Sequence, residues 1–205
     1  MILGVFSFLD RKRTPAARFW KWFQKNESTL FRLESAQDRI FTTLVGQILR
    51  VNRNLVFEFG PEIDGKREFV LSAGGFKNAF PAVLALADAA PHLSRWTITR
   101  FRPRRTEITE VQFNGRSMLP DAVMVAVRGG VPYIDIIMFL GGGEIDEETR
   151  RQFGFLFLDQ ALGEFDVATY VGKVEFKPRS DPSPAGKIPI RAFVREFDTL
   201  KARFN

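Results

Sequence analysis

The chain has 205 residues, of which 45% are hydrophobic, so it can close a substantial apolar core as one domain. A net charge of +6 at pH 7 favours an acidic partner, whereas the absence of cysteine excludes disulfides, thiolate nucleophiles and thiolate metal sites. The single histidine, His92, leaves little for imidazole chemistry, so we expect neither a metal nor a cofactor. The 22 phenylalanines carry no polar group, and we expect them to fill one continuous interior.

The N-terminal segment joins an apolar run to a basic cluster. Residues 1–9 are too few to span a bilayer, and the basic residues 11–13 follow them, whereas a signal peptide carries its charge first. Such a segment could rest on a membrane surface, but a loose terminus over residues 1–13 or an edge strand is the simpler interpretation. We therefore expect a cytoplasmic protein with no membrane association.

Two helices are predicted next. Thr14 and Pro15 have the character of an N-cap and a first helical position, and apolar residues recur at helical spacing up to Leu33. This pattern predicts a helix from about 15 to 33, with a break near Asn26. A capping box at Ser35 and an apolar stripe predict a second helix that ends near residue 50.

The first half of the chain then predicts a hairpin, a helix and a strand. Runs of β-branched and aromatic residues at 55–59 and 68–72 flank a turn that contains Asp64-Gly65. A helix over about 78–90, which ends at a proline, leads to a strand over 96–101.

The second half follows the same order. After a short strand at 108–113, residues 122–128 and 133–140 alternate as a hairpin, and a helix runs from Asp146 to Gly163. We expect a strand over 165–176, a proline-rich linker over 178–187 and an amphipathic helix over 189–204.

These two series suggest an internal repeat. The first copy ends in Phe-Arg-Pro-Arg at 101–104 and the second in Phe-Lys-Pro-Arg at 176–179. Two common motifs can also resemble each other by chance. We predict a single α+β domain over residues 1–205, in which two ββαβ units share one mostly antiparallel sheet with helices on one face. The N-terminal helical pair and the C-terminal amphipathic helix complete this fold.

Three short motifs carry a resemblance. They are Phe19-Trp20-Lys21-Trp22-Phe23 with Asn26-Glu27, Ala90-Pro91-His92-Leu93 before Trp96, and Leu162-Gly163-Glu164. Together they resemble a family of bacterial proteins of unknown function. The resemblance implies a cytoplasmic bacterial protein and supplies no activity, cofactor or catalytic residue.

Candidate site residues are few. Glu58 lies within an apolar strand, Glu164 lies at a helix-to-strand junction, and Arg100 belongs to the basic segment 95–116, so these three are the candidates for catalysis. A structural ion pair is the simpler role for Glu58, and an accidental pair of surface acids in one loop is the simpler account of Glu164 with Asp166. The candidates for binding are aromatic, polar or basic residues within the shared motifs and the arginine-rich stretch: Trp20, Asn26, Glu27, Trp96, Arg102 and Arg104.

Three functions are consistent with this pattern. The first is a non-enzymatic protein-interaction module, with a protein partner or a second copy of the chain. The second is an enzyme that acts on a small anionic substrate through carboxylates and arginines. The third, and least favoured, is binding of nucleic acid irrespective of sequence through the basic segments.

Overall fold

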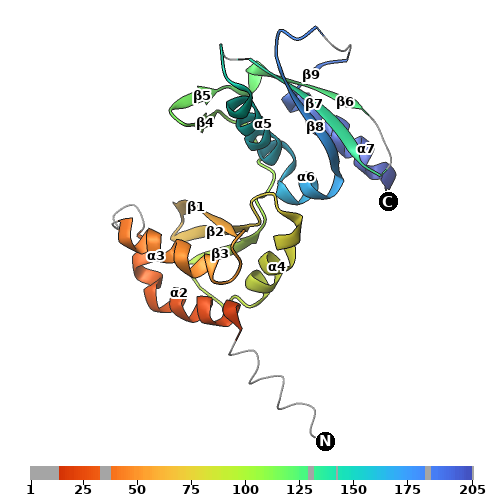
Figure 1. The fold of residues 1–205 in the computed structure, drawn as a ribbon. Coiled ribbons are helices and arrows are strands. Elements are labelled where there is room, and N and C mark those ends of the chain that lie inside the picture. Colours follow the sequence, from red (N-terminus) through yellow and green to blue (C-terminus); the bar gives the residue numbers. More distant parts are fainter. Residues whose placement is uncertain (1–13, 33–37, 129–131, 142, 183–185, 205) are drawn as a thin grey trace, which may run out of the picture. The chain divides into compact units, whose positions relative to one another are not determined.

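The computed structural model describes residues 14–32, 38–128, 132–141, 143–182 and 186–204 (Figure 1). The chain divides into two compact units, Met1–Phe101 and Arg102–Asn205, which we call unit 1 and unit 2. The predicted loose terminus 1–13 and the capping box at Ser35 lie outside the described residues.

Unit 1 begins with the predicted helical pair. Helix α2 (Pro15–Phe31) starts where Thr14 Oγ1 accepts a hydrogen bond from the Ala17 amide, and α3 (Asp38–Leu49) follows. The expected break near Asn26 is wrong, because this side chain donates to the Trp22 carbonyl inside the helix and α2 stays continuous.

The sheet of unit 1 has three strands. Strands β1 (Val56–Ile63) and β2 (Lys66–Ser72) pair antiparallel. A short 3-10 turn, η2 (Lys77–Ala79), and helix α4 (Phe80–Asp88) then lead to β3 (Trp96–Arg100), which pairs parallel with β2. The order is therefore β1-β2-β3, with α4 as the crossover between the two parallel strands.

An aromatic core joins this sheet to its helices. Phe69 is fully buried on β2, and its ring centroid lies 5.0–6.3 Å from six other aromatic rings. Such rings bury large apolar areas and gain further from edge and offset contacts. The six partners are Phe19, Trp20, Phe23, Phe57, Phe59 and Trp96.

Unit 2 contains a small hairpin and a four-stranded sheet. The hairpin is β4 (Val111–Phe113) with β5 (Arg116–Met118), followed by the 3-10 turn η3 (Pro120–Ala122). The sheet has the order β8-β7-β6-β9, in which only β7 and β8 are parallel. Its strands are β6 (Val123–Arg128), β7 (Ile134–Leu140), β8 (Val171–Pro178) and β9 (Ile188–Pro189).

The helices of unit 2 cover one face of this sheet. Helices α5 (Glu147–Leu162) and α7 (Ile190–Lys201) contribute Phe153, Phe157, Phe193 and Phe197 to a single cluster with β6 and β7. A short α6 (Glu164–Tyr170) follows α5, and a 3-10 turn, η4 (Ala202–Phe204), follows α7. The C-terminal amphipathic helix is thus confirmed.

The fold class is confirmed as α+β with mostly antiparallel pairing, but two details differ from expectation. The buried side chains form separate clusters in unit 1 and unit 2, so the expected single interior is wrong. The two hairpins also belong to different sheets instead of one. A single domain over residues 1–205 stays a prediction.

Candidate functional site

The Leu162-Gly163-Glu164 motif forms a turn between α5 and α6. Gly163 has φ +79°, which favours glycine, and a Cβ at this position would lie 2.8 Å from the Arg104 amide nitrogen. Glu164 donates its amide to the Arg102 carbonyl (2.9 Å), and its Oε2 accepts from the Arg102 amide (3.1 Å). The motif therefore fixes the segment after residue 101 against the α5–α6 junction.

Glu164 is buried with 1% of its surface exposed, so its carboxylate has a structural role. Replacing it with alanine removes the acceptor of a backbone amide, and we expect unit 2 to lose about 1–3 kcal/mol of unfolding free energy. Glu164→Gln keeps an acceptor oxygen and should retain most of that stability. Urea denaturation of the two variants measures the difference, and equal losses would contradict the assigned bond.

The three candidates for catalysis are not brought together. Within unit 1, Glu58 pairs with Val70, which pairs with Thr99, so Glu58 and Arg100 lie on opposite faces of the sheet. Arg100 forms an ion pair with Asp88 at the end of α4. Glu164 belongs to unit 2.

Both candidate tryptophans lie in the core of unit 1. Trp20 is buried and its indole Nε1 donates to the Leu86 carbonyl at 2.7 Å. Trp96 is also buried, and its Nε1 has no hydrogen-bond partner among the described residues. Neither ring is available as a stacking platform for a base.

The polar pair of the first motif also has local partners. Asn26 donates to the Trp22 carbonyl at 2.8 Å. Glu27 lies 3.3 Å from Arg95, whose guanidinium lies over the Phe31 ring, 4.4 Å from its centroid. These contacts tie α2 to the start of β3 through a partly exposed ion pair and a cation–π contact.

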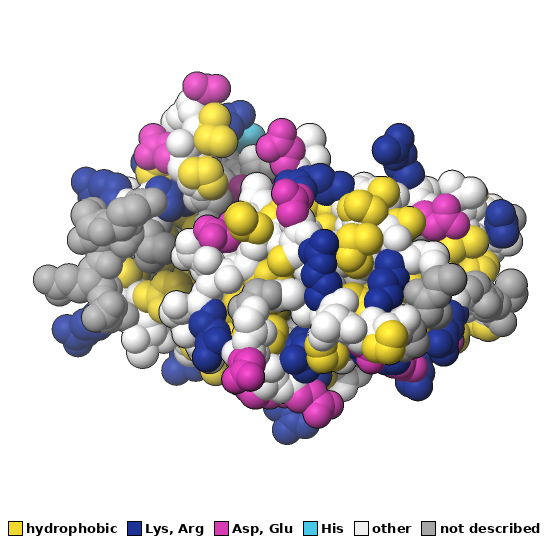
Figure 2. Space-filling view, turned by 90° about the horizontal axis from the view of Figure 1, so that it is seen from above, with side chains coloured by type: hydrophobic (Ala, Val, Ile, Leu, Met, Phe, Trp, Pro, Cys, Tyr) yellow, Lys and Arg dark blue, Asp and Glu magenta, His cyan; other side chains and the backbone are white. Residues whose placement is uncertain are grey.

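Arg102 is likewise held within unit 2. Its Nη1 lies 3.3 Å from Asp159 on α5, and both side chains are largely covered. On the face shown in Figure 2, Lys and Arg side chains are separated by hydrophobic, acidic and neutral ones. Three arginines of the arginine-rich stretch, Arg100, Arg102 and Arg104, each pair with a carboxylate, which weakens the electrostatic field that nucleic-acid binding requires.

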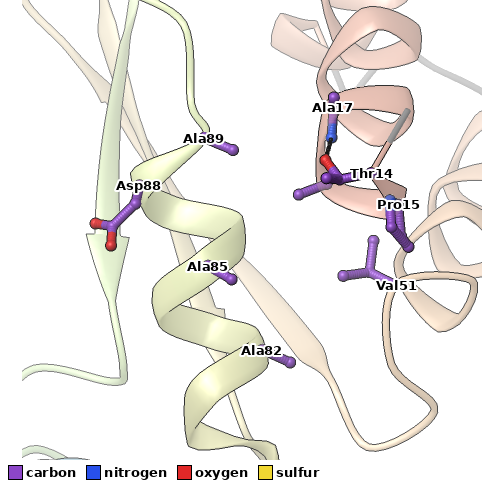
Figure 3. Close-up of a pocket in the computed structure, with 9 residues that line it drawn as sticks. Thr14, Pro15, Ala17, Val51, Ala82, Ala85, Asp88 and Ala89 are labelled. Atoms are coloured by element: carbon purple, nitrogen blue, oxygen red, sulfur yellow. Dashed lines mark hydrogen bonds between the residues drawn. The ribbon is translucent and has the colours of Figure 1, made fainter. Parts of the chain in front are cut away.

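Unit 1 contains an apolar groove of about 580 Å³ between the start of α2 and α4 (Figure 3). Ala82, Ala85 and Ala89 point from α4 toward Pro15 and Val51, whereas the Asp88 carboxylate points away. Small apolar side chains of this kind offer neither a charge nor a reactive group.

A second pocket of about 580 Å³ lies in unit 2 and is lined by four arginines. One wall is the irregular segment that begins at Arg104, and the other is α7, where two arginines are one helical turn apart. We call it the arginine pocket, and its lining residues are Arg104, Arg105, Thr106, Glu107, Ile108, Arg191, Val194 and Arg195.

Arg104 is fixed in this pocket by carboxylates. Its two terminal nitrogens donate to the two oxygens of Asp198 at 2.8 and 2.9 Å, and Asp166 lies 3.7 Å away. The hydrogen bonding of Arg104 to the Asp198 carboxylate raises the pKa of Arg104, and the same interaction lowers the pKa of Asp198. Lys201 in turn lies 2.7 Å from Asp166. Arg104 thus has a rigid, bidentate partner.

The lowered pKa of Asp198 predicts a pH dependence. A carboxyl that titrates lower in the folded state stabilises that state above its unfolded-state pKa of about 4, and the contribution disappears as the pH falls through the lowered folded-state value. Wild type should therefore be more stable than Asp198→Asn at pH 7, and the difference should shrink as the solution is acidified below pH 4. Denaturation midpoints of both proteins across this pH range measure the stability difference, and a difference that grows in acid would contradict the Arg104–Asp198 pairing.

The two arginines of α7 are more available. Arg191 donates from Nη1 to the carboxylate of Asp121, a residue with 84% of its side chain accessible, and from Nη2 to the Ile108 carbonyl at a long 3.4 Å. Arg195 forms no hydrogen bond or ion pair through its side chain with the described residues, and it is exposed at the pocket. Both guanidiniums can therefore accept an anionic group from outside.

Sequence reasoning identified Arg104 but missed Arg191 and Arg195. Their spacing of four residues on the polar face of an amphipathic helix was a usable signal. The packing of α7 beside the segment 104–108 is a tertiary contact, which no local sequence pattern specifies.

Within the described ranges, no group of three or more acidic or histidine side chains could hold a metal ion. The helices that the structure describes are all too short or too polar to cross a bilayer. Comparisons with protein-family models, with curated proteins and with solved structures return no match for this chain.

Proposed function

We propose that the protein is a non-enzymatic binding module whose arginine pocket takes the anionic group of a ligand or partner. The observation that carries this proposal is the convergence of four arginines from two elements around a volume of about 580 Å³. Guanidinium groups match carboxylate and phosphate oxygens geometrically, and pockets of this size accommodate small ligands.

The surroundings of the carboxylates support binding over catalysis. Glu164 is committed to the Arg102 backbone, and Glu107 is the one acid among the lining residues. A general base must reach the proton that it abstracts, and a nucleophile must have such a base beside it. Enzymatic action on a small anion stays the second hypothesis because the pocket also suits such a substrate in size and charge.

The broader sequence predictions remain proposals. Each unit runs from an antiparallel hairpin through a helix to a strand parallel to the second hairpin strand, and this shared order supports an internal repeat. A cytoplasmic bacterial protein and a protein partner also stay predictions.

Binding measurements on the full chain test the proposal. We expect phosphate, citrate or N-acetyl-leucine to bind, and Arg195→Gln to weaken binding by about fivefold or more through loss of a charge-assisted hydrogen bond. Arg151→Gln removes an exposed arginine of α5 outside the pocket and serves as the matched control. The proposal fails if none of these anions binds, or if both variants bind as wild type does.

A further inference from the structure

The charge around the arginine pocket limits what it can hold. Four arginines and Glu107 line the pocket, the ion pairs of Arg104 and Arg191 add Asp198, Asp166 and Asp121, and Lys201 pairs in turn with Asp166. Five cations against four anions leave one positive charge. A ligand with a single negative charge balances this set, whereas a polyphosphate or a nucleic-acid backbone would bring excess negative charge beside the carboxylates.

The arginines differ in how readily they can accept a ligand. Arg104 is engaged through two short hydrogen bonds, so its carboxylate is hard to displace. The Arg191–Asp121 pair is exposed and is therefore weak and exchangeable. Arg195 needs no displacement at all. An incoming anion would therefore meet Arg195 first and compete with Asp121 for Arg191.

Asp121 also indicates which anion fits. Its side chain is a carboxylate that accepts a hydrogen bond from Nη1 of the Arg191 guanidinium, although Asp121 itself does not line the pocket. A carboxylate from a ligand can make the same contact in the same geometry. The protein's own acid thus marks the chemistry of the group that Arg191 recognises.

The pocket also offers apolar surface next to these charges. Val194 is half-buried between Arg191 and Arg195 on α7, whereas Ile108 on the other wall is only 7% exposed and belongs to the core of unit 2. The aliphatic stems of the two arginines extend this surface. A ligand that is entirely polar would leave it uncovered.

We propose that the ligand of the arginine pocket is a monocarboxylate on an apolar body, held by Arg195 and Arg191 over Val194 and the aliphatic stems of the two arginines. This inference rests on the proposed function. The same chemistry is found in a free organic acid and in the C-terminal carboxylate of a peptide that ends in an apolar residue.

Titration calorimetry on the full chain, with four small probes, tests this inference. N-acetyl-leucine should bind at least about fivefold more tightly than its amide, than acetate and than inorganic phosphate, because it alone combines one carboxylate with an apolar body. Asp121→Asn removes the competing carboxylate and should tighten N-acetyl-leucine binding by about twofold to fivefold. Arg195→Gln should weaken it, and Arg151→Gln should not.

The possible outcomes test the proposed anion-binding function and the carboxylate inference separately. If phosphate binds more tightly than N-acetyl-leucine and Arg195→Gln abolishes that binding, the pocket is an anion site but the carboxylate inference is overturned. If none of the anions binds, both the inference and the proposed function fail. If N-acetyl-leucine binds most tightly, the peptide acetyl-Ala-Ala-Ala-Leu with a free C-terminus tests which kind of molecule supplies the carboxylate. Tighter binding than N-acetyl-leucine indicates a peptide C-terminus, and equal binding indicates a free organic acid.

Discussion

Phe69→Ala is expected to destabilise unit 1 strongly while the stability of unit 2 stays unchanged. The ring of Phe69 touches six other aromatic rings in a fully buried position, and removing it should cost about 3–5 kcal/mol. A unit of this size has a total stability of about 5–15 kcal/mol, so the loss is a large part of what it has.

The aromatic residues allow the two units to be followed separately. All three tryptophans, Trp20, Trp22 and Trp96, belong to unit 1, and both tyrosines, Tyr133 and Tyr170, belong to unit 2. Urea denaturation monitored by tryptophan emission should shift strongly for Phe69→Ala, while the Tyr170 environment in an NMR spectrum should not. Phe76→Ala removes an exposed phenylalanine of unit 1 and should have little effect. Loss of both signals in one transition would instead support the single domain predicted from the sequence.

Gly163→Ala is expected to destabilise unit 2 by about 2–4 kcal/mol, for two additive reasons. The residue has φ +79°, where a side chain is strained, and its Cβ would lie 2.8 Å from the Arg104 nitrogen and 3.2 Å from the Arg102 oxygen. Both neighbours are backbone atoms, and Glu164 holds the Arg102 backbone through two hydrogen bonds, so they cannot move aside cheaply.

Gly143→Ala is the matched control for this substitution. Gly143 also has a positive φ, of +88°, but nothing lies within 4 Å of the Cβ that it would gain. It should therefore show the backbone strain alone, at about 1 kcal/mol. Chemical denaturation, monitored by NMR signals from unit 2, compares the stabilities of the two variants. Equal losses of unfolding free energy would show that the close approach at Gly163 carries no cost.

Local patterns predicted most helices and strands because their causes are local. Thr14 caps α2 and Asp146 caps α5 as their sequence positions suggest, and Asp64-Gly65 forms the β1–β2 turn with positive φ at both residues. The hairpin of β4 and β5 carried the same kind of signal. Asn114-Gly115 forms its turn with positive φ at both positions, yet the sequence interpretation recognised only the first strand.

Other elements depend on contacts that a linear pattern does not contain. The predicted strand over 165–176 is wrong in its first half, where a new helix, α6, begins at Glu164 after the turn at Gly163, with Glu164 bound to the Arg102 backbone. The two-residue strand β9 exists only through its pairing with β6, inside a region expected to be a linker and the start of a helix. The amino-acid composition likewise gives the number of phenylalanines but does not show that they are divided between two cores.

The sequence predicted only part of the candidate site. An arginine-rich stretch after residue 100 is visible in the sequence, and Arg104 does line the pocket. Arg102 does not, because Asp159 and the Glu164 junction hold it. Trp20 and Trp96 were candidates for binding, and burial places both of them in the core of unit 1.

The most direct test of the arginine pocket is an NMR titration of the full chain, labelled with ¹⁵N at arginine, with N-acetyl-leucine. The largest changes should occur at the Nε signals of Arg191 and Arg195, because these guanidiniums meet the carboxylate, and Arg151 should stay unchanged. Changes confined to arginines of unit 1, or none at saturating ligand, would contradict the assignment of binding to this pocket.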